Sequence, residues 1–374
     1  MFDKHTWVLP REILPLIGEC DALIYTLKNA PLTPEVFEEL KKKSLKRGAL
    51  ATTAIEGNSI TEEEFDKYIA RKKTMPPSRQ YQKVEIENVL NAFAAVENIP
   101  PDQPLNCALI KRLHSLIMAE KPEAVPGQFR PGNVVVGTYR PPDYQKVPAL
   151  IEKYCQWLQA FKFPSHISLL ETLPVALAAH VFFELIHPFS DGNGRLGRMI
   201  EYCLLLRAGL PLTAGHILSN YYNQTRDNYY KYLAGIDYQN PDRGLLDFMV
   251  YAIQGLCDGL YEALDLVREN QKKVFWQRLV YDRFSGKDEQ LDRSDKKRRR
   301  SVVLNFPLED ETGLVLEEIP VMTKTLEYGD LPKGTLNQDL AYLEHLGLIR
   351  KVGEKYYANY DHDCPSCQIL PKES

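Results

Sequence analysis

Residues 187–198 read HPFSDGNGRLGR, and this stretch decides how the rest of the chain is interpreted. It brings a histidine, an aspartate, several glycines and two arginines together, directly before an apolar segment typical of a buried helix. Pro188 disfavours helical geometry at His187, so the apolar helix before it is expected to end there. A second helix is expected from about Arg195. His187 therefore lies where one helix ends and the next begins.

The glycines and arginines of this stretch predict a site for phosphate groups. Gly192 and Gly194 permit positive φ angles and a close approach of the backbone N–H groups to a ligand. Free N–H groups at a helix start, together with the helix dipole, attract anions. Arg195 and Arg198 are three residues apart, hence on one helix face, and their guanidinium groups suit phosphate oxygens.

The acid and the histidine add the remaining parts of a transfer reaction. Asp191 is explained if a Mg²⁺ ion lies between its carboxylate and the phosphates. His187 is placed to act as a general base on an incoming hydroxyl. A DGNG segment alone is more often an ordinary turn with a capping aspartate. The full constellation instead favours phosphoryl or nucleotidyl transfer.

At this point a resemblance becomes evident. HPFSDGNGRLGR is similar, position for position, to the Fic family motif H-P-F-x-[D/E]-G-N-G-R-x-x-R. PGQFR at 126–130, VVVGTYRPP from Val134 and the apolar helix before His187 also look like parts of a Fic domain, over about residues 30–265. The resemblance implies a mainly α fold: a Fic-type helical bundle with a short β-hairpin flap and a C-terminal α+β winged helix-turn-helix. It also implies a protein adenylyltransferase, which transfers AMP from ATP to a hydroxyl side chain of a target protein.

The resemblance implies a role for each motif position, with ATP and Mg²⁺ as cofactors. His187 would deprotonate the target hydroxyl, and Asp191 would hold the metal. The glycines and asparagine would cradle the α- and β-phosphates, and the arginines would bind the outer phosphates, so that pyrophosphate leaves. The implied ATP-binding residues in the motif are Gly192, Asn193, Gly194, Arg195, Leu196, Gly197 and Arg198.

Two further regions would complete the site. The flap would pair with an extended segment of the target protein by main-chain hydrogen bonds. Tyr229 is the first choice for a wall of the adenine pocket; Tyr221, Tyr222 and Tyr230 compete, and packing on a helix face is an equal alternative for each. The flap residues are Val134, Val135, Val136, Gly137, Thr138 and Tyr139.

Thr52-x-x-x-Glu56-Gly57 resembles the signature [S/T]-x-x-x-E-[G/N] of the inhibitory helix in one class of Fic proteins, class II. Read alone, Glu56–Gly57 is a helix C-terminus with a glycine cap. Upstream of the Fic motif, its carboxylate is expected to pair with Arg198 and occupy the place of the ATP γ-phosphate. The resemblance therefore implies an autoinhibited enzyme.

Composition places the chain among soluble globular proteins. It has 374 residues, of which 44% are apolar and 26% charged, and its net charge of −4 gives no global attraction to nucleic acid or membrane. The N-terminus does not resemble a signal peptide, and no uninterrupted apolar run approaches the length of a membrane span. Five of the seven cysteines lie among apolar or helical neighbours, typical of reduced thiols. We therefore expect a cytoplasmic protein without membrane contact.

The sequence predicts three regions. Residues 1–75 form an N-terminal helical region with the inhibitory helix, residues 76–268 the catalytic domain, and residues 269–374 a winged-helix domain. The highly charged run 286–300 is expected to be exposed. Beyond it, a helix capped by Thr335 with leucines on one face, followed by strand, glycine turn and strand, is the winged-helix pattern.

The C-terminal domain leaves DNA binding open but not favoured. KKRRR at 296–300 supplies a basic patch, whereas the expected recognition helix carries Asp339 and Glu344 and no Lys or Arg. Packing or protein interaction is the preferred role. A single C-x-x-C, Cys364 and Cys367, falls short of the usual four zinc ligands and is not counted as a site.

Two other functions remain as alternatives. A Fic-fold enzyme can transfer another phosphate-linked group or remove AMP, with Glu56 positioning a water molecule. Alternatively, a winged-helix regulator can use its Fic-like part only to sense nucleotide, although such a sensor would not need His187. Self-modification and a homodimer are both compatible with the sequence.

Overall fold

The computed structural model describes residues 2, 6–70, 76–162, 168–285, 292–308, 313–323, 328, 331–332 and 334–359. The chain divides into two compact units, Met1–Leu264 and Asp265–Ser374. The expected N-terminal helical region and most of the expected catalytic domain lie together in the first unit. The long helix α11 (Asp242–Phe284) contributes residues to both units.

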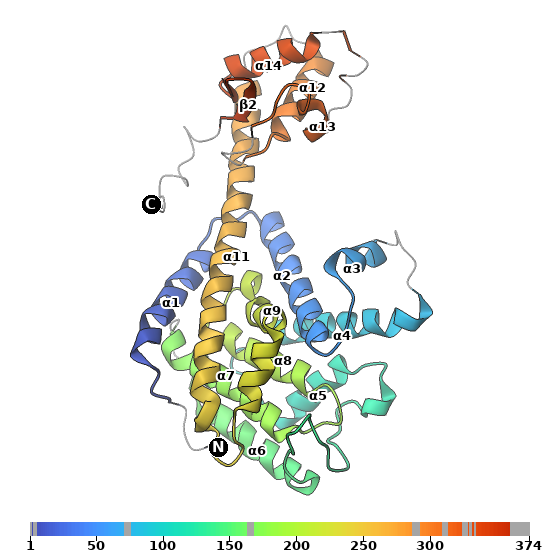
Figure 1. The fold of residues 1–374 in the computed structure, drawn as a ribbon, viewed down its shortest axis with the longest axis vertical. Helices are drawn as coiled ribbons and strands as arrows, with labels where there is room; N and C mark the ends of the chain where they lie inside the picture. Colours follow the sequence, from blue (N-terminus) through green and yellow to red (C-terminus); the bar gives the residue numbers. More distant parts are fainter. Residues whose placement is uncertain are drawn as a thin grey trace. The chain divides into compact units, whose positions relative to one another are not determined.

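The first unit is helical, as expected for a mainly α fold (Figure 1). Short 3₁₀ helices connect several of its α-helices. They are η1 (Arg11–Ile13), η2 (Pro77–Arg79), η3 (Pro122–Ala124), η4 (Tyr144–Lys146) and η5 (Leu212–Ala214). The α-helices before α11 are α1 (Leu14–Lys28), α2 (Pro34–Ile55), α3 (Glu62–Ile69), α4 (Gln80–Glu97), α5 (Cys107–Ile117), α6 (Val147–Ala160), α7 (Leu169–Ile186), α8 (Asn193–Arg207), α9 (Ile217–Gln224) and α10 (Arg226–Ala234).

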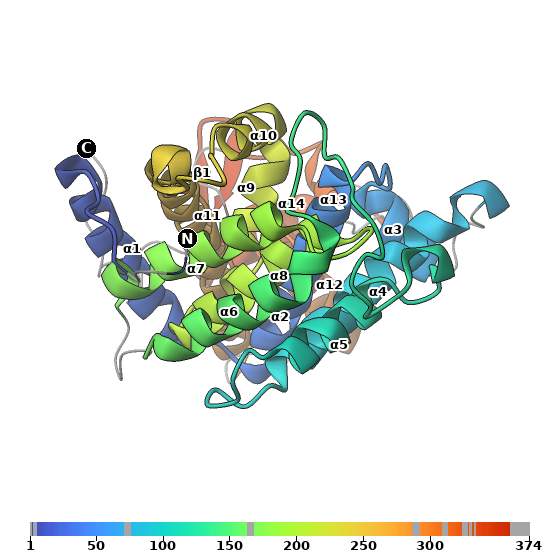
Figure 2. The ribbon, with the colours of Figure 1, turned by 90° about the horizontal axis from the view of Figure 1, so that it is seen from below.

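Helices α7 and α8 form the centre of this unit. Figure 2 shows them crossing its middle, with α1 on one side and α4 and α5 on the other. α7 is apolar on nearly all sides, which explains why most of its side chains are buried. By length and composition α7 is the one described helix that could cross a membrane, but 83% of it is buried inside the unit, as in the core helix of a globular protein.

Both ends of α2 are capped. The Thr33 side chain accepts from the backbone N–H of Val36, with Pro34 as the first helical residue. α2 ends at Ile55 with Glu56 as its C-cap, and Gly57 follows with a φ of 100°. α2 packs against α4, α8 and α9, so its C-terminal end is fixed beside the centre of the unit.

The cysteines agree with the expectation of unpaired thiols. Cys20, Cys155, Cys203 and Cys257 are buried and Cys107 is partly buried, and all five are free. Cys364 and Cys367 lie outside the described residues.

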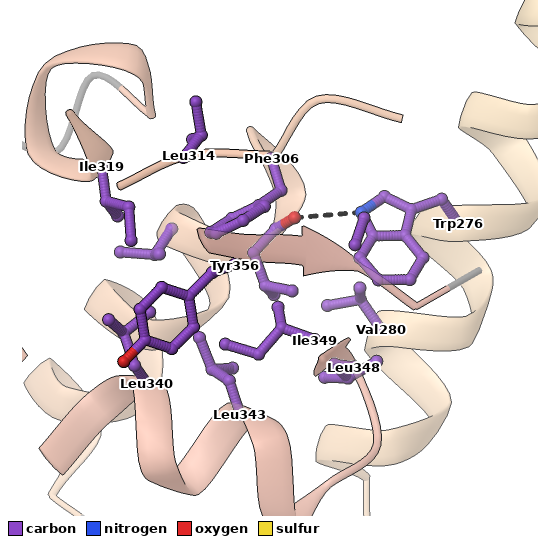
Figure 3. Close-up of a cluster of buried hydrophobic side chains, with 13 residues drawn as sticks. Trp276, Val280, Phe306, Leu314, Ile319, Leu340, Leu343, Leu348, Ile349 and Tyr356 are labelled. Carbon is purple, nitrogen blue, oxygen red and sulfur yellow. Dashed lines mark hydrogen bonds between the residues drawn. The ribbon is translucent and has the colours of Figure 1, made fainter. Parts of the chain in front are cut away.

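The second unit has its own hydrophobic core. Its elements after α11 are α12 (Arg293–Leu304), α13 (Ile319–Met322), α14 (Thr335–His345), β1 (Ile349–Val352) and β2 (Lys355–Ala358). β1 and β2 form an antiparallel hairpin with Ile349 opposite Ala358, and a single bridge joins Leu314 to Tyr356. Figure 3 shows leucines of α14 and residues of the hairpin meeting Trp276, whose indole N–H donates to the carbonyl oxygen of Val303 at 3.0 Å. The identification of this unit as a winged helix stays a prediction.

Two expectations for the second unit were wrong. The charged run is not exposed throughout: Arg298 in α12 is buried, because Asp339 of α14 accepts from both Arg298 and Arg299 at 2.6–3.1 Å. Burial alone would raise the pKa of Asp339, but these arginines and the Tyr328 hydroxyl lower it below the usual value. The cap of α14 is Gly334, with a φ of 96°, and Thr335 is the first helical residue.

Candidate active site

The loop of residues 187–192 joins α7 to α8, as the sequence predicts. His187 ends α7 in the left-handed conformation, with φ 48° and ψ 62°, and its backbone N–H donates to the carbonyl oxygen of Phe183 at 3.0 Å. A positive φ is uncommon outside glycine and is held here by the following loop. Gly192 has a φ of 78° and caps α8, which begins at Asn193, two residues before the expected start. The N–H groups at the start of α8 therefore lie in the same loop as His187.

Side chains from outside the loop fix its shape. Arg130 donates through Nε to the carbonyl oxygen of His187 at 2.8 Å. His114 Nε2 lies 2.9 Å from the Asp191 carbonyl oxygen, and the His114 ring stacks on Phe189 with centroids 3.7 Å apart. The sequence patterns did not indicate these roles, although Arg130 ends the PGQFR segment.

The side chain of Asn193 stabilises the loop and is not free to bind a ligand. Its amide oxygen accepts from the backbone N–H of Phe189, and its amide nitrogen donates to the Phe189 carbonyl, both at 2.9 Å. The side chain is buried and fully engaged. Only the backbone N–H of Asn193 remains for the predicted phosphate contact.

Asp191 lies between two cations. Its carboxylate binds Lys121 Nζ at 2.8 Å and Arg195 NH2 at 3.0 Å. Burial would raise the pKa of Asp191, but Lys121 and Arg195 hold it below the usual value, so the group is ionised at neutral pH. In the described part of the chain no three His, Cys, Asp or Glu side chains gather into a metal site. One ionised carboxylate fits Mg²⁺ if phosphate oxygens supply other ligands.

A cavity of about 640 Å³ lies beside the loop. Of the predicted site residues it is lined by His187, Gly194, Arg198, Tyr229, Glu56 and residues 136–139. Glu184 and Tyr230 also line it; Glu184 was not among the predicted site residues, and Tyr230 was only an alternative to Tyr229 for the adenine pocket. A carboxylate in the last, mostly apolar turns of α7, three positions before His187, was a usable signal for Glu184.

Several predicted phosphate ligands lie away from this cavity. Arg195 is buried between Asp191 and Glu85, with its NH1 3.5 Å from the Glu85 carboxylate. Leu196 is fully buried. Gly197 lies where α8 meets α7, and a Cβ there would be 2.8 Å from Glu184 Oε1. The structure therefore brings Arg198, and not Arg195, to the cavity.

The expected ion pair between Glu56 and Arg198 is present. Glu56 Oε1 accepts from Arg198 NH2 at 2.7 Å. Thr52, one turn earlier on α2, accepts from Arg198 Nε through its hydroxyl at 2.7 Å and from NH2 through its carbonyl at 3.1 Å. Burial alone would lower the pKa of Arg198. The nearby Tyr229 and Glu56 have the larger, opposite effect, so the pKa of Arg198 lies above the usual arginine value.

Tyr229 does not form an open wall of the cavity. Its ring is 1% exposed, and its hydroxyl is bonded to Arg198 and His180. Tyr230, by contrast, is 44% exposed, and its hydroxyl donates to the Ile55 carbonyl at 3.0 Å. Of these two tyrosines, Tyr230 has the free ring surface that a base could stack on.

His187 and Glu184 have shifted acidities because both are buried. Burial lowers the pKa of His187 to about 4, so its imidazole is neutral at pH 7. Burial raises the pKa of Glu184 to about 7, and its buried Oε1 has no hydrogen-bond partner among the described residues. Glu184 Oε2 lies 3.8 Å from His187 Nδ1. A neutral imidazole at the cavity can accept a proton.

The flap is shorter than the expected hairpin. One antiparallel bridge joins Val136 and Tyr139, with both backbone hydrogen bonds at 2.9 Å around Gly137 and Thr138. The Tyr139 hydroxyl donates to the Leu185 carbonyl at 2.6 Å and ties the flap to α7. Val135 remains 63% exposed. The flap thus presents apolar surface beside the cavity.

Known proteins share this fold and this loop. The sequence model of the Fic/DOC family matches residues 104–205. Relatives named protein adenylyltransferase Fic are 37% identical over 102 residues in Drosophila erecta and 34% identical over 124 residues in Drosophila yakuba. These matches cover 27% and 33% of this chain but 20% and 23% of the relatives, so the chain spans about a fifth of their length.

Two solved structures have a similar fold. A Fic family protein from Desulfovibrio desulfuricans G20 has a TM-score of 0.58 at 20% identity, covering 94% of this chain and 97% of that one. A Fic domain containing signaling protein from Bacteroides thetaiotaomicron has a TM-score of 0.53 at 20% identity, covering 67% and 95%. At this identity the likeness shows the fold. Because the matched residues 104–205 include the complete HPFSDGNGRLGR loop, this segment of the chain is a Fic domain.

Proposed function

We propose that this Fic domain protein is an autoinhibited protein adenylyltransferase, which transfers AMP from ATP to a hydroxyl side chain of a target protein. One observation carries the proposal: a neutral His187 and a buried Arg198 line the same cavity, and Glu56 holds Arg198. The names of the relatives over the matched segment support the same reaction.

His187 acts as the general base in this proposal. Its ring is bonded to the backbone of Glu184, which fixes its orientation, and its lowered pKa leaves a lone pair free at neutral pH. The target hydroxyl gives its proton to His187, and its oxygen forms a bond to the α-phosphorus. The bond from that phosphorus to the pyrophosphate oxygen breaks, and pyrophosphate leaves with its electron pair.

The phosphates are held by the start of α8. The N–H groups of Asn193, Gly194 and Arg195 have no carbonyl one turn earlier in the helix and can donate to phosphate oxygens. Arg198 binds the outer phosphates through a planar guanidinium. Asp191 would hold Mg²⁺, which neutralises phosphate charge when bound.

Glu56 is the brake. A carboxylate bound to Arg198 occupies the donor that an outer phosphate needs and repels phosphate by like charge. An ATP molecule that enters beside Glu56 is held with its α-phosphate away from the line of attack. Substitution of Glu56 removes both effects and leaves His187 in place.

The flap docks the target. Its bridge between Val136 and Tyr139 is short, and Val135 is exposed beside it, so an extended segment of the target can add alongside by main-chain hydrogen bonds. This arrangement would bring the target hydroxyl to His187. Protein interaction is also the role that we propose for the second unit, because Asp339 occupies Arg298 and Arg299.

Intact-mass spectrometry tests the reaction type. The Glu56→Gly variant is incubated with ATP and Mg²⁺, alone and with cell lysate, and the modified proteins are weighed. A mass increase equal to one AMP is the expected result. Loss of AMP from a previously modified protein on incubation with the wild type, which retains Glu56, without any addition of AMP by the variant, would instead identify a hydrolase. No change in any protein with either form would favour a nucleotide sensor.

A further inference from the structure

A chain of buried side chains connects Arg198 with the core of the first unit. Arg198 NH1 donates to the Tyr229 hydroxyl at 3.1 Å, and this hydroxyl lies 3.0 Å from His180 Nε2. His180 Nδ1 in turn lies 2.8 Å from Glu201 Oε2. All four residues are at most 2% exposed, and α7, α8 and α10 each contribute at least one. We call Arg198, Tyr229, His180 and Glu201 the Arg198 relay.

One arrangement of protons satisfies every hydrogen bond in the relay. Arg198 can only donate, so the Tyr229 oxygen accepts. The single Tyr229 proton is then free to donate to His180 Nε2, and the His180 proton on Nδ1 donates to the Glu201 carboxylate. Each donor thus finds an acceptor in one arrangement, and buried networks satisfied in this way hold a unique geometry.

We propose that Tyr229 is a positioning residue that fixes the Arg198 guanidinium for the γ-phosphate, and so determines the preference for ATP over ADP. This inference rests on the proposed function of Arg198 as a ligand of the outer phosphates. It assigns Tyr229 a different role from the adenine contact expected from the sequence.

The contacts explain why the position of Arg198 survives release of the brake. Glu56 and the Thr52 carbonyl oxygen each accept from NH2, whereas the Thr52 hydroxyl accepts from Nε and the Tyr229 hydroxyl from NH1. When the Glu56 carboxylate leaves, NH2 gains a free donor position at the cavity while the other two nitrogens remain tied. A preoriented guanidinium binds phosphate without the entropic cost of ordering a long side chain.

The chain offers a matched pair of variants. Tyr229→Phe removes only the hydroxyl and keeps the ring, whose centroid lies 4.7 Å from that of the stacked Tyr222 ring. Tyr222 is equally buried, and its hydroxyl donates to Glu201 Oε2 at 3.0 Å, not to Arg198. Tyr222→Phe therefore removes a hydroxyl from the same cluster without touching the guanidinium.

The test measures ATP and ADP affinities by isothermal titration calorimetry with Mg²⁺. All variants carry Glu56→Gly and His187→Ala, which remove the brake and the base, so that no transfer disturbs the titration. Tyr229→Phe should bind ATP about tenfold more weakly, as expected for loss of one hydrogen bond to a charged group, and ADP less than twofold more weakly. Tyr222→Phe should change neither affinity.

Equal weakening of ATP by Tyr229→Phe and Tyr222→Phe, or no weakening by Tyr229→Phe, would overturn the positioning role. Arg198→Ala separates this failure from a failure of the proposed function, because unchanged ATP affinity there would remove Arg198 from phosphate binding altogether. If Tyr229→Phe does not fold, His180→Asn takes its place. It keeps Tyr229 but alters its acceptor, and it should lower the ATP affinity severalfold with little change for ADP.

Discussion

Glu56 Oε1 lies 2.7 Å from Arg198 NH2, so a carboxylate at the end of α2 binds a guanidinium in the first turns of α8 across 142 residues of sequence. The contact depends on Gly194, which lies against both side chains. A Cβ atom at Gly194 would clash with Glu56 Oε1 and lie 3.1 Å from Arg198 NH1. Glycine at this position therefore allows the ion pair to form.

A double-mutant cycle tests this dependence. Gly194→Ala should lower the free energy of unfolding in the wild type, because Glu56 must move off Arg198, and should cost less in the Glu56→Gly background. We expect a coupling of about 1–2 kcal/mol between the two positions, measured by chemical denaturation. Additive effects of the two substitutions would show that the side chains do not meet as described.

Gly192 and Gly18 should respond to alanine in opposite directions. Gly192 has a φ of 78°, and a Cβ there would lie 2.5 Å from Met118 Sδ, so Gly192→Ala should destabilise the first unit by about 1–3 kcal/mol. Gly18 lies inside α1, where an added Cβ would have no atom within 4 Å, and Gly18→Ala should stabilise by about 0.5–1 kcal/mol. Thermal unfolding measures both, and the same sign for both would contradict the loop geometry.

Titration of His187 should not change the rate of the Glu56→Gly variant near neutral pH. A base works when deprotonated, and burial lowers the pKa of His187 to about 4, so activity is lost only as the pH falls toward that value. Initial rates of Glu56→Gly between about pH 5.5 and 8, corrected for ATP saturation, measure this. A rate that halves near the ordinary histidine pKa of about 6.5, and still does so when Glu184→Gln removes the neighbouring carboxyl group with its pKa of about 7, would show that His187 is solvated.

The second unit should depend on the buried carboxylate of Asp339. Asp339→Asn leaves Arg298 and Arg299 without their shared anionic partner, and removal of one member of such a network costs about 3–5 kcal/mol. Asp295→Asn is the control, because Asp295 is more exposed and pairs with Arg298 from the same helix. Calorimetry of the full chain should show the transition of this unit lowered by the first substitution and nearly unchanged by the second.

The same ion pairs bear on DNA binding. Because Arg298 and Arg299 are engaged by Asp339, we expect no duplex binding by the full chain in a gel-shift titration, even at low salt. Binding that weakens steeply with added salt would contradict this and restore the basic run as a DNA contact.

Sequence patterns predicted those parts of the site that depend on local rules. Pro188 after an apolar helix predicted the end of α7. The Glu56–Arg198 pair was predictable because the resemblance covers both signatures, although no local rule links residues so far apart.

The remainder depends on side-chain directions that a linear pattern does not contain. Tyr229 and Tyr230 are neighbours, yet one ring enters the core and the other faces the cavity, because α10 turns about 100° per residue. Asp339 was interpreted only as an acid of the expected recognition helix, because its arginine partners lie 41 and 40 residues earlier in a run that looked solvated. Asn193 looked like a phosphate ligand, but its amide closes the loop on Phe189.

The central claim is that Glu56 alone holds a complete transfer site inactive. Its most direct test is the initial rate of label incorporation from ATP labelled at the α-phosphate, compared among wild type, Glu56→Gly and the Glu56→Gly, His187→Ala double variant. We predict little incorporation in the wild type, a strong rise in Glu56→Gly and none in the double variant, with no incorporation from ATP labelled at the γ-phosphate. Equal incorporation in wild type and Glu56→Gly would contradict the brake, and undiminished incorporation in the double variant would contradict the base.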